Sequence, residues 1–175
     1  MTGRHRKSRV FWPICLLLVL ADCSSKDLVV ERFGPPHVPH EVIDGVVRFT
    51  LAYNPDAAMG LSLGPFSRVG FALAALIGLV VIATIYRRVP AQHTWHVIAL
   101  ALIGGGAAGN LLDRLRSTHG VVDFIDVGIG DHRFWWVFNI ADLGVTVGAG
   151  ILAWIAWRAD TTAAGGGGAA TPEAG

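Results

Sequence analysis

The sequence predicts an all-α polytopic membrane protein with four transmembrane helices. Apolar residues make up 53% of the 175 residues, charged residues make up only 15%, and the mean hydropathy is +0.52. A soluble domain carries roughly a quarter charged residues, so this composition favours a membrane protein. Four apolar stretches are close to the ~20 residues that a helix needs to cross the hydrocarbon core. They cover residues 10–30, 66–86, 94–112 and 134–157.

The first stretch is apolar as far as Ala21 and then becomes polar, with Asp22 and Lys26 inside it. An ionisable side chain within a span is costly and usually functional, so Asp22 is a candidate site residue. Basic residues, an apolar run and Cys23 also resemble the cleaved signal peptide of a lipoprotein. However, Asp22 occupies the position of the small residue that should precede the lipidated cysteine, and three further spans follow. An intact first span is therefore the better interpretation.

The second and third stretches indicate packing helices. The second is apolar apart from Arg68 near its start, and the third is rich in glycine and alanine. No Lys-Ser/Thr pair follows these glycines, so they do not form a phosphate-binding loop. Gly105 and Gly109 are four residues apart, a spacing that lets helices approach closely in lipid.

A polar group follows the glycines at the end of the third stretch. Asn110 and Arg114 are four residues apart and therefore share one face of a helix. Together with the neighbouring Asp113 they predict a polar network at the outer end of this span.

The fourth stretch carries an aspartate within its apolar run. Tryptophans stand near both ends of the stretch, as an aromatic interface belt predicts. Six residues at about 1.5 Å each separate Trp136 from Asp142, so a helix starting at Phe134 places this carboxylate about 9 Å below the interface. An uncompensated aspartate there costs about 2.5–3.5 kcal/mol or more. Asn139, three residues away, is on an adjacent face, and Asp142 needs a proton or a partner.

The best candidate partner is Asp123, which lies in an apolar segment on the same side of the membrane, just before the fourth span. Two carboxylates that share a poorly solvated site cannot easily both ionise, so one pKa rises. That provides one acid and one base at neutral pH, as aspartic peptidases require. Spacing alone leaves Asp113 and Asp126 as alternatives to Asp123.

Basic residues predict the topology. They precede the first span and follow the second and fourth, which predicts that both termini are cytoplasmic. The two outer loops are then residues 31–65 and 113–133. Alternation over residues 47–53 predicts a strand in the first loop. Residues 1–160 form one domain, and the Ala/Gly-rich residues 161–175 are expected to be a disordered cytoplasmic tail.

Several other function classes lack support in the sequence. The net charge of +1 gives no reason to expect nucleic acid binding, and the chain has two cysteines but no Cys/His cluster. We therefore expect no metal site and no cofactor. We expect a monomer surrounded by membrane lipid.

Taken together, these segments resemble the lipoprotein signal peptidase (signal peptidase II) family of aspartic peptidases. The family patterns are Gly-Gly-Ala-x-Gly-Asn-x-x-Asp-Arg, Val-Val-Asp-Phe, Phe-Asn-x-Ala-Asp and Asn-x-Gly-Ala-Ala-Phe-Gly. The matching segments are Gly105–Arg114, Val121–Phe124, Phe138–Asp142 and Asn54–Gly60. Residues 22–26 also resemble the family's Asp-x-x-Thr-Lys element.

The resemblance implies that Asp123 and Asp142 are the catalytic aspartates. Positions that would bind substrate or support the site are Asn54, Gly60, Asn110, Arg114, Asn139, Asp22 and Lys26. It also implies a small extracytoplasmic β-cradle in the first outer loop. The substrate would be a diacylglyceryl-modified prolipoprotein, cut just before its lipidated cysteine, near the outer face of the bacterial cytoplasmic membrane.

The chain departs from the family pattern at three positions. Asp56 replaces a glycine, which predicts a differently shaped turn. Met59 replaces a phenylalanine of similar volume, and Ser25 replaces a threonine but keeps the hydroxyl.

The alternative from another class is a small proton-coupled transporter subunit that uses intramembrane aspartates, Asp22 and Asp142, as relay groups. Such a protein should carry acids at mid-depth in several spans, whereas the second and third spans have none there. A purely structural subunit would explain the glycines but not Asp142.

Overall fold

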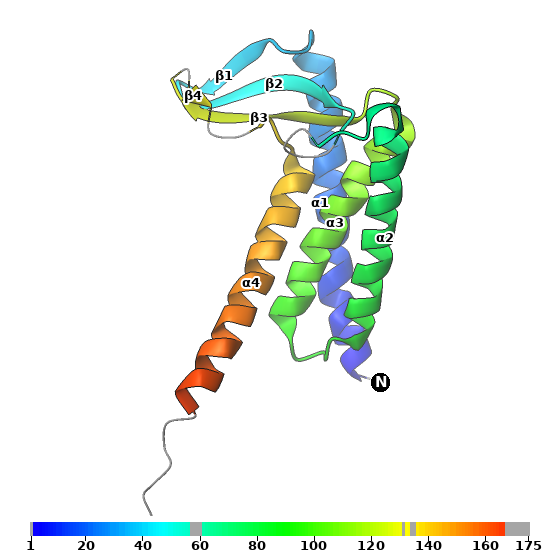
Figure 1. Ribbon diagram of the computed structural model, residues 1–175, viewed down its shortest axis with the longest axis vertical. Helices are drawn as coiled ribbons and strands as arrows, with labels where there is room; N and C mark the ends of the chain where they lie inside the picture. The colour runs from blue at the N-terminus through cyan, green and yellow to red at the C-terminus, as the bar shows by residue number, and fades with distance from the viewer. Residues whose placement is uncertain (1, 57–60, 131, 134–135, 167–175) are drawn as a thin grey trace, which may run out of the picture.

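The computed structural model describes residues 2–56, 61–130, 132–133 and 136–166. Within these ranges a bundle of long helices is capped at one end by a small antiparallel sheet (Figure 1). In chain order, the elements are α1 (Thr2–Arg32), β1 (Pro39–Ile43), β2 (Val47–Asn54), the 3-10 turn η2 (Gly64–Phe66), α2 (Ser67–Arg88), α3 (Thr94–Arg116), β3 (Val121–Ile129), β4 (His132–Arg133) and α4 (Ile140–Gly166).

The described part of the chain contains 3 helical segments that are long and apolar enough to cross a membrane. They are Gly64–Arg88, Thr94–Arg116 and Ile140–Thr161. The first predicted span also forms one continuous helix, α1, which is not one of these three. The prediction of a mostly helical membrane protein with a small sheet is thus confirmed at this level.

Helix α3 lies at the centre of the bundle, where it contacts α1, α2 and α4 (Figure 1). Its small residues allow this contact, as the sequence predicted. A Cβ atom on Gly106 would overlap the main-chain carbonyl of Ala141 in α4, and one on Gly109 would lie 2.5 Å from Asp22 Oδ2 in α1. The glycines therefore bring α1 and α4 close to the same end of α3.

The sheet joins the loop between α1 and α2 to the loop between α3 and α4, with strands in the order β1-β2-β3-β4. The strand predicted over residues 47–53 is confirmed as β2, and β1 pairs with it antiparallel. Its other neighbour, β3, comes from the second loop, where the sequence analysis predicted no strand. Gly120 makes this pairing possible, because its φ is +96° and a Cβ there would overlap the main chain at Asn54.

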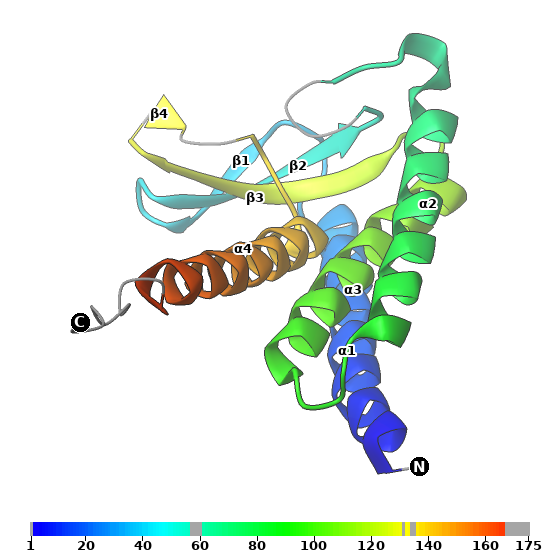
Figure 2. The same ribbon diagram turned by 60° about the horizontal axis from the view of Figure 1, so that its bottom comes forward.

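An apolar cluster holds the sheet on the end of the bundle. Val29 of α1 packs with Leu51 of β2 and with Val122 and Phe124 of β3. Figure 2 shows that the sheet extends sideways from this contact, across the start of α4. The sheet is thus held against the end of α1 and lies over the start of α4.

The start of α4 corrects the prediction of a span beginning at Phe134. The helix begins at Ile140, because Phe138 is extended and pairs with β3. Its carbonyl accepts hydrogen bonds from the amides of Phe124 and Ile125, at 3.0 and 2.7 Å. Asp142 is consequently in the first turn of α4, not one and a half turns inside it.

The far end of α4 also differs from the expected boundary. The helix continues to Gly166, so it includes the first residues of the predicted tail, 161–175. Residues 167–175 lie outside the described residues.

Candidate active site

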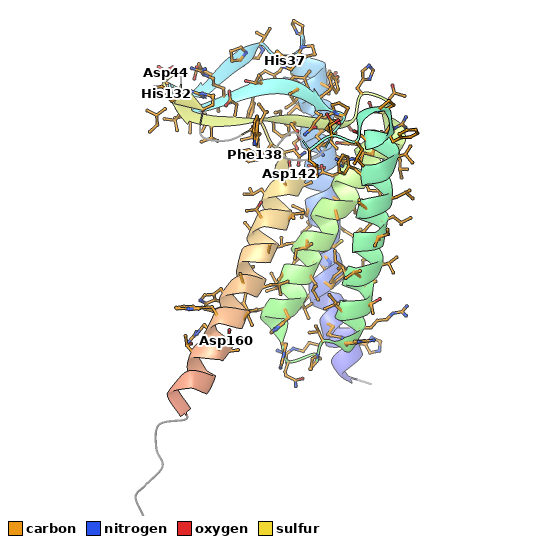
Figure 3. The ribbon with its side chains drawn as sticks, in the orientation of Figure 1. His37, Asp44, His132, Phe138, Asp142 and Asp160 are labelled. Carbon is orange, nitrogen blue, oxygen red and sulfur yellow. The ribbon has the colours of Figure 1, made fainter. Side chains whose placement is uncertain are left out.

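A network of polar side chains lies where the sheet meets the bundle. Figure 3 shows Asp142 and Phe138 beneath the sheet at the start of α4, with Asp160 near the opposite end of that helix. The network includes every predicted site residue within the described ranges. These are Asp22, Lys26, Asn54, Asn110, Arg114, Asp123, Asn139 and Asp142. Gly60 lies outside the described residues.

A reciprocal pair of hydrogen bonds holds Asp142 at the N-terminus of α4. Asn139 Oδ1 accepts from the amide of Asp142 at 2.9 Å, and Asp142 Oδ2 accepts from the amide of Asn139 at 3.2 Å. This is the arrangement of a capping box, in which a side chain satisfies the free amide of the capping residue. The positive end of the helix dipole favours a negative charge at this position.

Asp123 is buried in β3, with only 4% of its surface exposed. Its Oδ1 accepts from Asn139 Nδ2 at 2.7 Å, and its Oδ2 accepts from Asn54 Nδ2 at 3.1 Å. Burial, and next the charge of Asp142, raise the pKa of Asp123 to about 7, although both amide donors oppose this rise. Asp123 therefore exchanges a proton near neutral pH.

Asn139 links the two carboxylates directly. It is fully buried, its amide nitrogen contacts Asp123, and its amide oxygen and main-chain N–H contact Asp142. The main-chain N–H of Asp142 can only donate, so the side-chain oxygen of Asn139 must face it. The side-chain NH₂ group of Asn139 must then face Asp123. One side chain thus brings the acids of β3 and α4 into one site.

Asn110 provides a second link, from α3. Its Nδ2 donates to Asp142 Oδ1 at 2.7 Å, and its Oδ1 accepts from Lys26 Nζ at 3.0 Å. An ammonium group has no acceptor, so the contact with Lys26 fixes which end of the amide faces Asp142. Both carboxylate oxygens of Asp142 therefore accept hydrogen bonds.

Lys26 is the cation at the centre of the network. Its buried Nζ is 2.7 Å from Asp22 Oδ2 and 2.8 Å from Asp113 Oδ2. Asp22 also accepts from the amide of Ala141 in α4 at 2.9 Å, and Asp113 accepts from the amide of Val122 in β3 at 3.2 Å. The ion pairs therefore fix α4 and β3, which carry Asp142 and Asp123, relative to α1 and α3.

Spacing in the sequence makes Asp113 and Asp126 alternatives to Asp123, and Asp113 also neighbours the polar pair Asn110 and Arg114. In the structure Asp113 is bound by Lys26, whereas Asp126 lies 3.7 Å from Arg133 and accepts from Thr50 at 3.4 Å. Asp113 was predicted beside a polar network, but not among the residues that support the site. Its position four residues after Gly109, in the same motif as Asn110, was the available signal.

Arg114 lies at the edge of the network. Among the described residues it makes no hydrogen bond to Asp123 or Asp142. Its guanidinium donates to the carbonyls of Asn110 at 3.2 Å and Asp56 at 3.0 Å. The contact with Asp56 uses the main chain, so it does not require the family's glycine at that position. This explains why the departure at Asp56 is compatible with the site.

Chemically, this arrangement is an acid–base pair. The buried carboxylate of Asp123 and the half-buried carboxylate of Asp142 are joined by one amide, and that of Asp123 titrates near pH 7, which suits general acid–base catalysis. In the described ranges no group of three or more His, Cys, Asp or Glu side chains is placed to hold a metal ion.

Comparisons with known proteins agree on one family. A family model described as signal peptidase (SPase) II matches residues 14–158. A lipoprotein signal peptidase of Moorella thermoacetica is 37% identical over 144 residues, covering 82% of this chain and 90% of the relative. The corresponding protein of Pseudomonas putida is 38% identical over 150 residues, covering 85% and 87%.

Solved structures agree with the sequence comparisons. One bacterial membrane enzyme matches with a TM-score of 0.72 and 27% identity, over 93% of this chain and 92% of the other. A second matches with a TM-score of 0.70 and 28% identity, over 81% and 88%.

Proposed function

The chain belongs to the signal peptidase II family of membrane aspartic peptidases, which remove signal peptides from prolipoproteins, and from this premise we propose that Asp123 and Asp142 are its catalytic pair. The observation that carries the proposal is the double contact of Asn139, which hydrogen-bonds to both carboxylates. Family membership favours a peptidase over the alternative of a proton-coupled transporter.

The two acids take different roles in the proposed mechanism. Ionised Asp142 accepts a proton from water as the water oxygen attacks the carbonyl carbon before the lipidated cysteine. Protonated Asp123 donates its proton to the carbonyl oxygen as that oxygen gains negative charge. The peptide C–N bond then breaks as a proton passes from Asp142 to the leaving nitrogen, and the carbonyl re-forms as its hydroxyl returns a proton to Asp123. Its pKa of about 7 supports giving Asp123 the acid role.

The remaining site residues are proposed to position these groups. Asn54, Asn110 and Asn139 orient the carboxylates through their hydrogen bonds, and Arg114 holds the main chain of Asp56 beside the site. Asp22 and Lys26 support the site from α1. Gly60 is proposed to contact the substrate, in accordance with its motif.

All four long helices are proposed to cross the membrane, with both termini in the cytoplasm and the site near the outer face. The start of α1 and the far end of α4 both lie away from the sheet (Figure 1). Arg87 and Arg88, at the end of α2, are at that same end, as the positive-inside rule predicts. The sheet then rests over the outer leaflet, where a diacylglyceryl-modified signal sequence enters between the spans. We propose that the enzyme acts as a monomer and without a cofactor.

Cleavage of a defined precursor tests this function. The purified chain should convert a diacylglyceryl-modified prolipoprotein into a product whose N-terminus is the lipidated cysteine, as read by mass spectrometry. The same precursor without its lipid should remain uncut. A product that begins at another residue, or equal cleavage of the unlipidated precursor, would contradict the proposal.

The pH profile of cleavage should report Asp123. Because the acid role requires its protonated form, kcat/KM should fall as pH rises through about 7. Asn54→Ala removes a hydrogen bond that stabilises the ionised form, so the pKa should rise and the fall should move to higher pH. Kinetics between pH 5 and 9 in a lipid-like detergent measure both midpoints. Coincident midpoints in the two proteins would be inconsistent with Asp123 as the acid.

A further inference from the structure

A groove lies at the end of the bundle opposite the candidate active site. Its volume is about 890 Å³, and residues from the start of α1, the end of α2 and the loop before α3 line it. These three segments lie together at the end of the bundle away from the sheet (Figure 1). Its walls include Lys7 and Trp12 from α1, residues 86–88 from α2 and Pro90 from the loop. The proposed peptidase mechanism does not use this groove.

The groove is strongly basic. Lys7, Arg87 and Arg88 line it, and no carboxylate is among its lining residues. The chain has no Asp or Glu before Asp22 and none between Asp56 and Asp113, so no acid lies on the neighbouring loop or on α2. Such a groove attracts an anion.

The fold already uses Lys7, but it leaves the two arginines available. Lys7 Nζ donates to the carbonyls of Tyr86 at 2.9 Å and Val89 at 2.7 Å, and thereby neutralises the negative C-terminus of α2. Arg87 and Arg88 are exposed, and within the described part of the chain their guanidinium groups have no ion pair. Their charges are therefore free to bind a ligand.

One wall of the groove is apolar and aromatic. Trp12 is 53% exposed, and Ala83 lies one turn from the arginines on α2. Tryptophan is typical of the boundary between the headgroups and the hydrocarbon core. The groove thus has cations at the helix ends and an apolar surface about one turn further along α1 and α2.

We propose that this groove binds an anionic glycerophospholipid. Its phosphate lies between Arg87 and Arg88, and an acyl chain runs along Trp12. Basic pockets between membrane helices recognise anionic headgroups in this way. The apolar wall favours a lipid over free phosphate. Under the proposed topology the lipid belongs to the cytoplasmic leaflet, but its binding does not depend on the peptidase assignment.

The experiment compares two double variants that remove the same charge from the same end of the protein. Arg87→Gln/Arg88→Gln changes the groove, whereas Arg6→Gln/Arg9→Gln changes exposed residues of α1 that do not line it. Each full-length protein in neutral detergent is titrated with dioleoylphosphatidylglycerol, dioleoylphosphatidylcholine, sodium phosphate or polyglutamate. Native mass spectrometry measures the bound molecule, and thermal unfolding measures stabilisation.

We expect one phosphatidylglycerol to bind the unmodified protein and to raise its Tm. The groove variant should bind it about tenfold to thirtyfold more weakly, and the control variant should stay within about threefold. In neutral detergent without added lipid, both variants should unfold at the Tm of the unmodified protein, which shows that they fold. If the groove variant does not fold, Arg87→Lys/Arg88→Lys keeps the charges and should retain binding.

Four outcomes would overturn the proposal. Equal binding of phosphatidylcholine would show that charge is not recognised. Equal loss in both double variants would show a diffuse electrostatic effect and no site at the groove. Equal stabilisation by sodium phosphate would identify a free-phosphate site, and tighter binding of polyglutamate would identify an acidic polypeptide as the ligand.

Discussion

Asp142→Asn and Asp123→Asn should each reduce cleavage of a diacylglyceryl-modified precursor by about 10²–10⁴-fold, the effect expected from loss of a general base or acid. Asparagine preserves the size of each side chain and its acceptor oxygen. At position 142 that oxygen can still accept from the amide of Asn139, so the start of α4 remains capped. The other oxygen becomes an NH₂ group that faces the donor Nδ2 of Asn110, so one hydrogen bond is lost. We therefore expect cleavage to fall far more than stability. A gel-shift assay of precursor processing measures the rate.

Asp126→Asn is the matched control for this prediction. Asp126 lies on the same strand as Asp123, three residues away, but contacts Thr50 and Arg133 instead of Asn139. We expect its activity to stay within a few-fold of the unmodified protein. An active Asp123→Asn variant beside an inactive Asp126→Asn variant would transfer the catalytic role to Asp126.

Among the variants described here, Lys26→Met should lose the most stability. Lys26 neutralises both Asp22 and Asp113, and Asp22 is fully buried. Removing one partner of a buried ion pair leaves an uncompensated charge and costs about 3–5 kcal/mol. The free energy of unfolding in detergent should fall by about this amount, and cleavage should fall with it, because Lys26 also orients Asn110.

The double variant Asp22→Asn/Lys26→Met separates charge from packing. The amide that replaces the Asp22 carboxylate is uncharged and needs no counter-ion. The double variant should therefore recover part of the stability lost in Lys26→Met. If the double variant is less stable than Lys26→Met, the Asp22–Lys26 ion pair is not the source of the loss. If Lys26→Met unfolds like the unmodified protein, the ion-pair network is unimportant for the fold.

Local patterns in the sequence were enough to predict most of the helices and one strand. Helix formation and membrane insertion depend on apolar residues within about 20 consecutive positions, and strand β2 depends on alternation over a few residues. Strand β3 was missed, because apolar and polar residues do not alternate regularly along residues 121–129. Its pairing with β2 joins two loops that are separated by the whole of α2 and α3.

The start of α4 was predicted wrongly for a related reason. Residues 134–138 are all apolar and therefore predict that the span starts before Ile140. The one local signal for the true start, Asn139 followed three residues later by Asp142 as in a capping box, was not used. The boundary results from hydrogen bonds between Phe138 and β3, which form only when the sheet is in place.

Within the site, residue types and hydropathy were enough to predict that Asp142 is an acid in an apolar segment and requires a partner or a proton. How that requirement is met depends on contacts between distant segments: Asn139 joins Asp142 to Asp123, and Lys26 binds Asp22 and Asp113. The physical reason is that the cost of burying a charge depends on the residue and its local surroundings. The compensating hydrogen bonds and ion pairs depend on where distant segments of the chain meet.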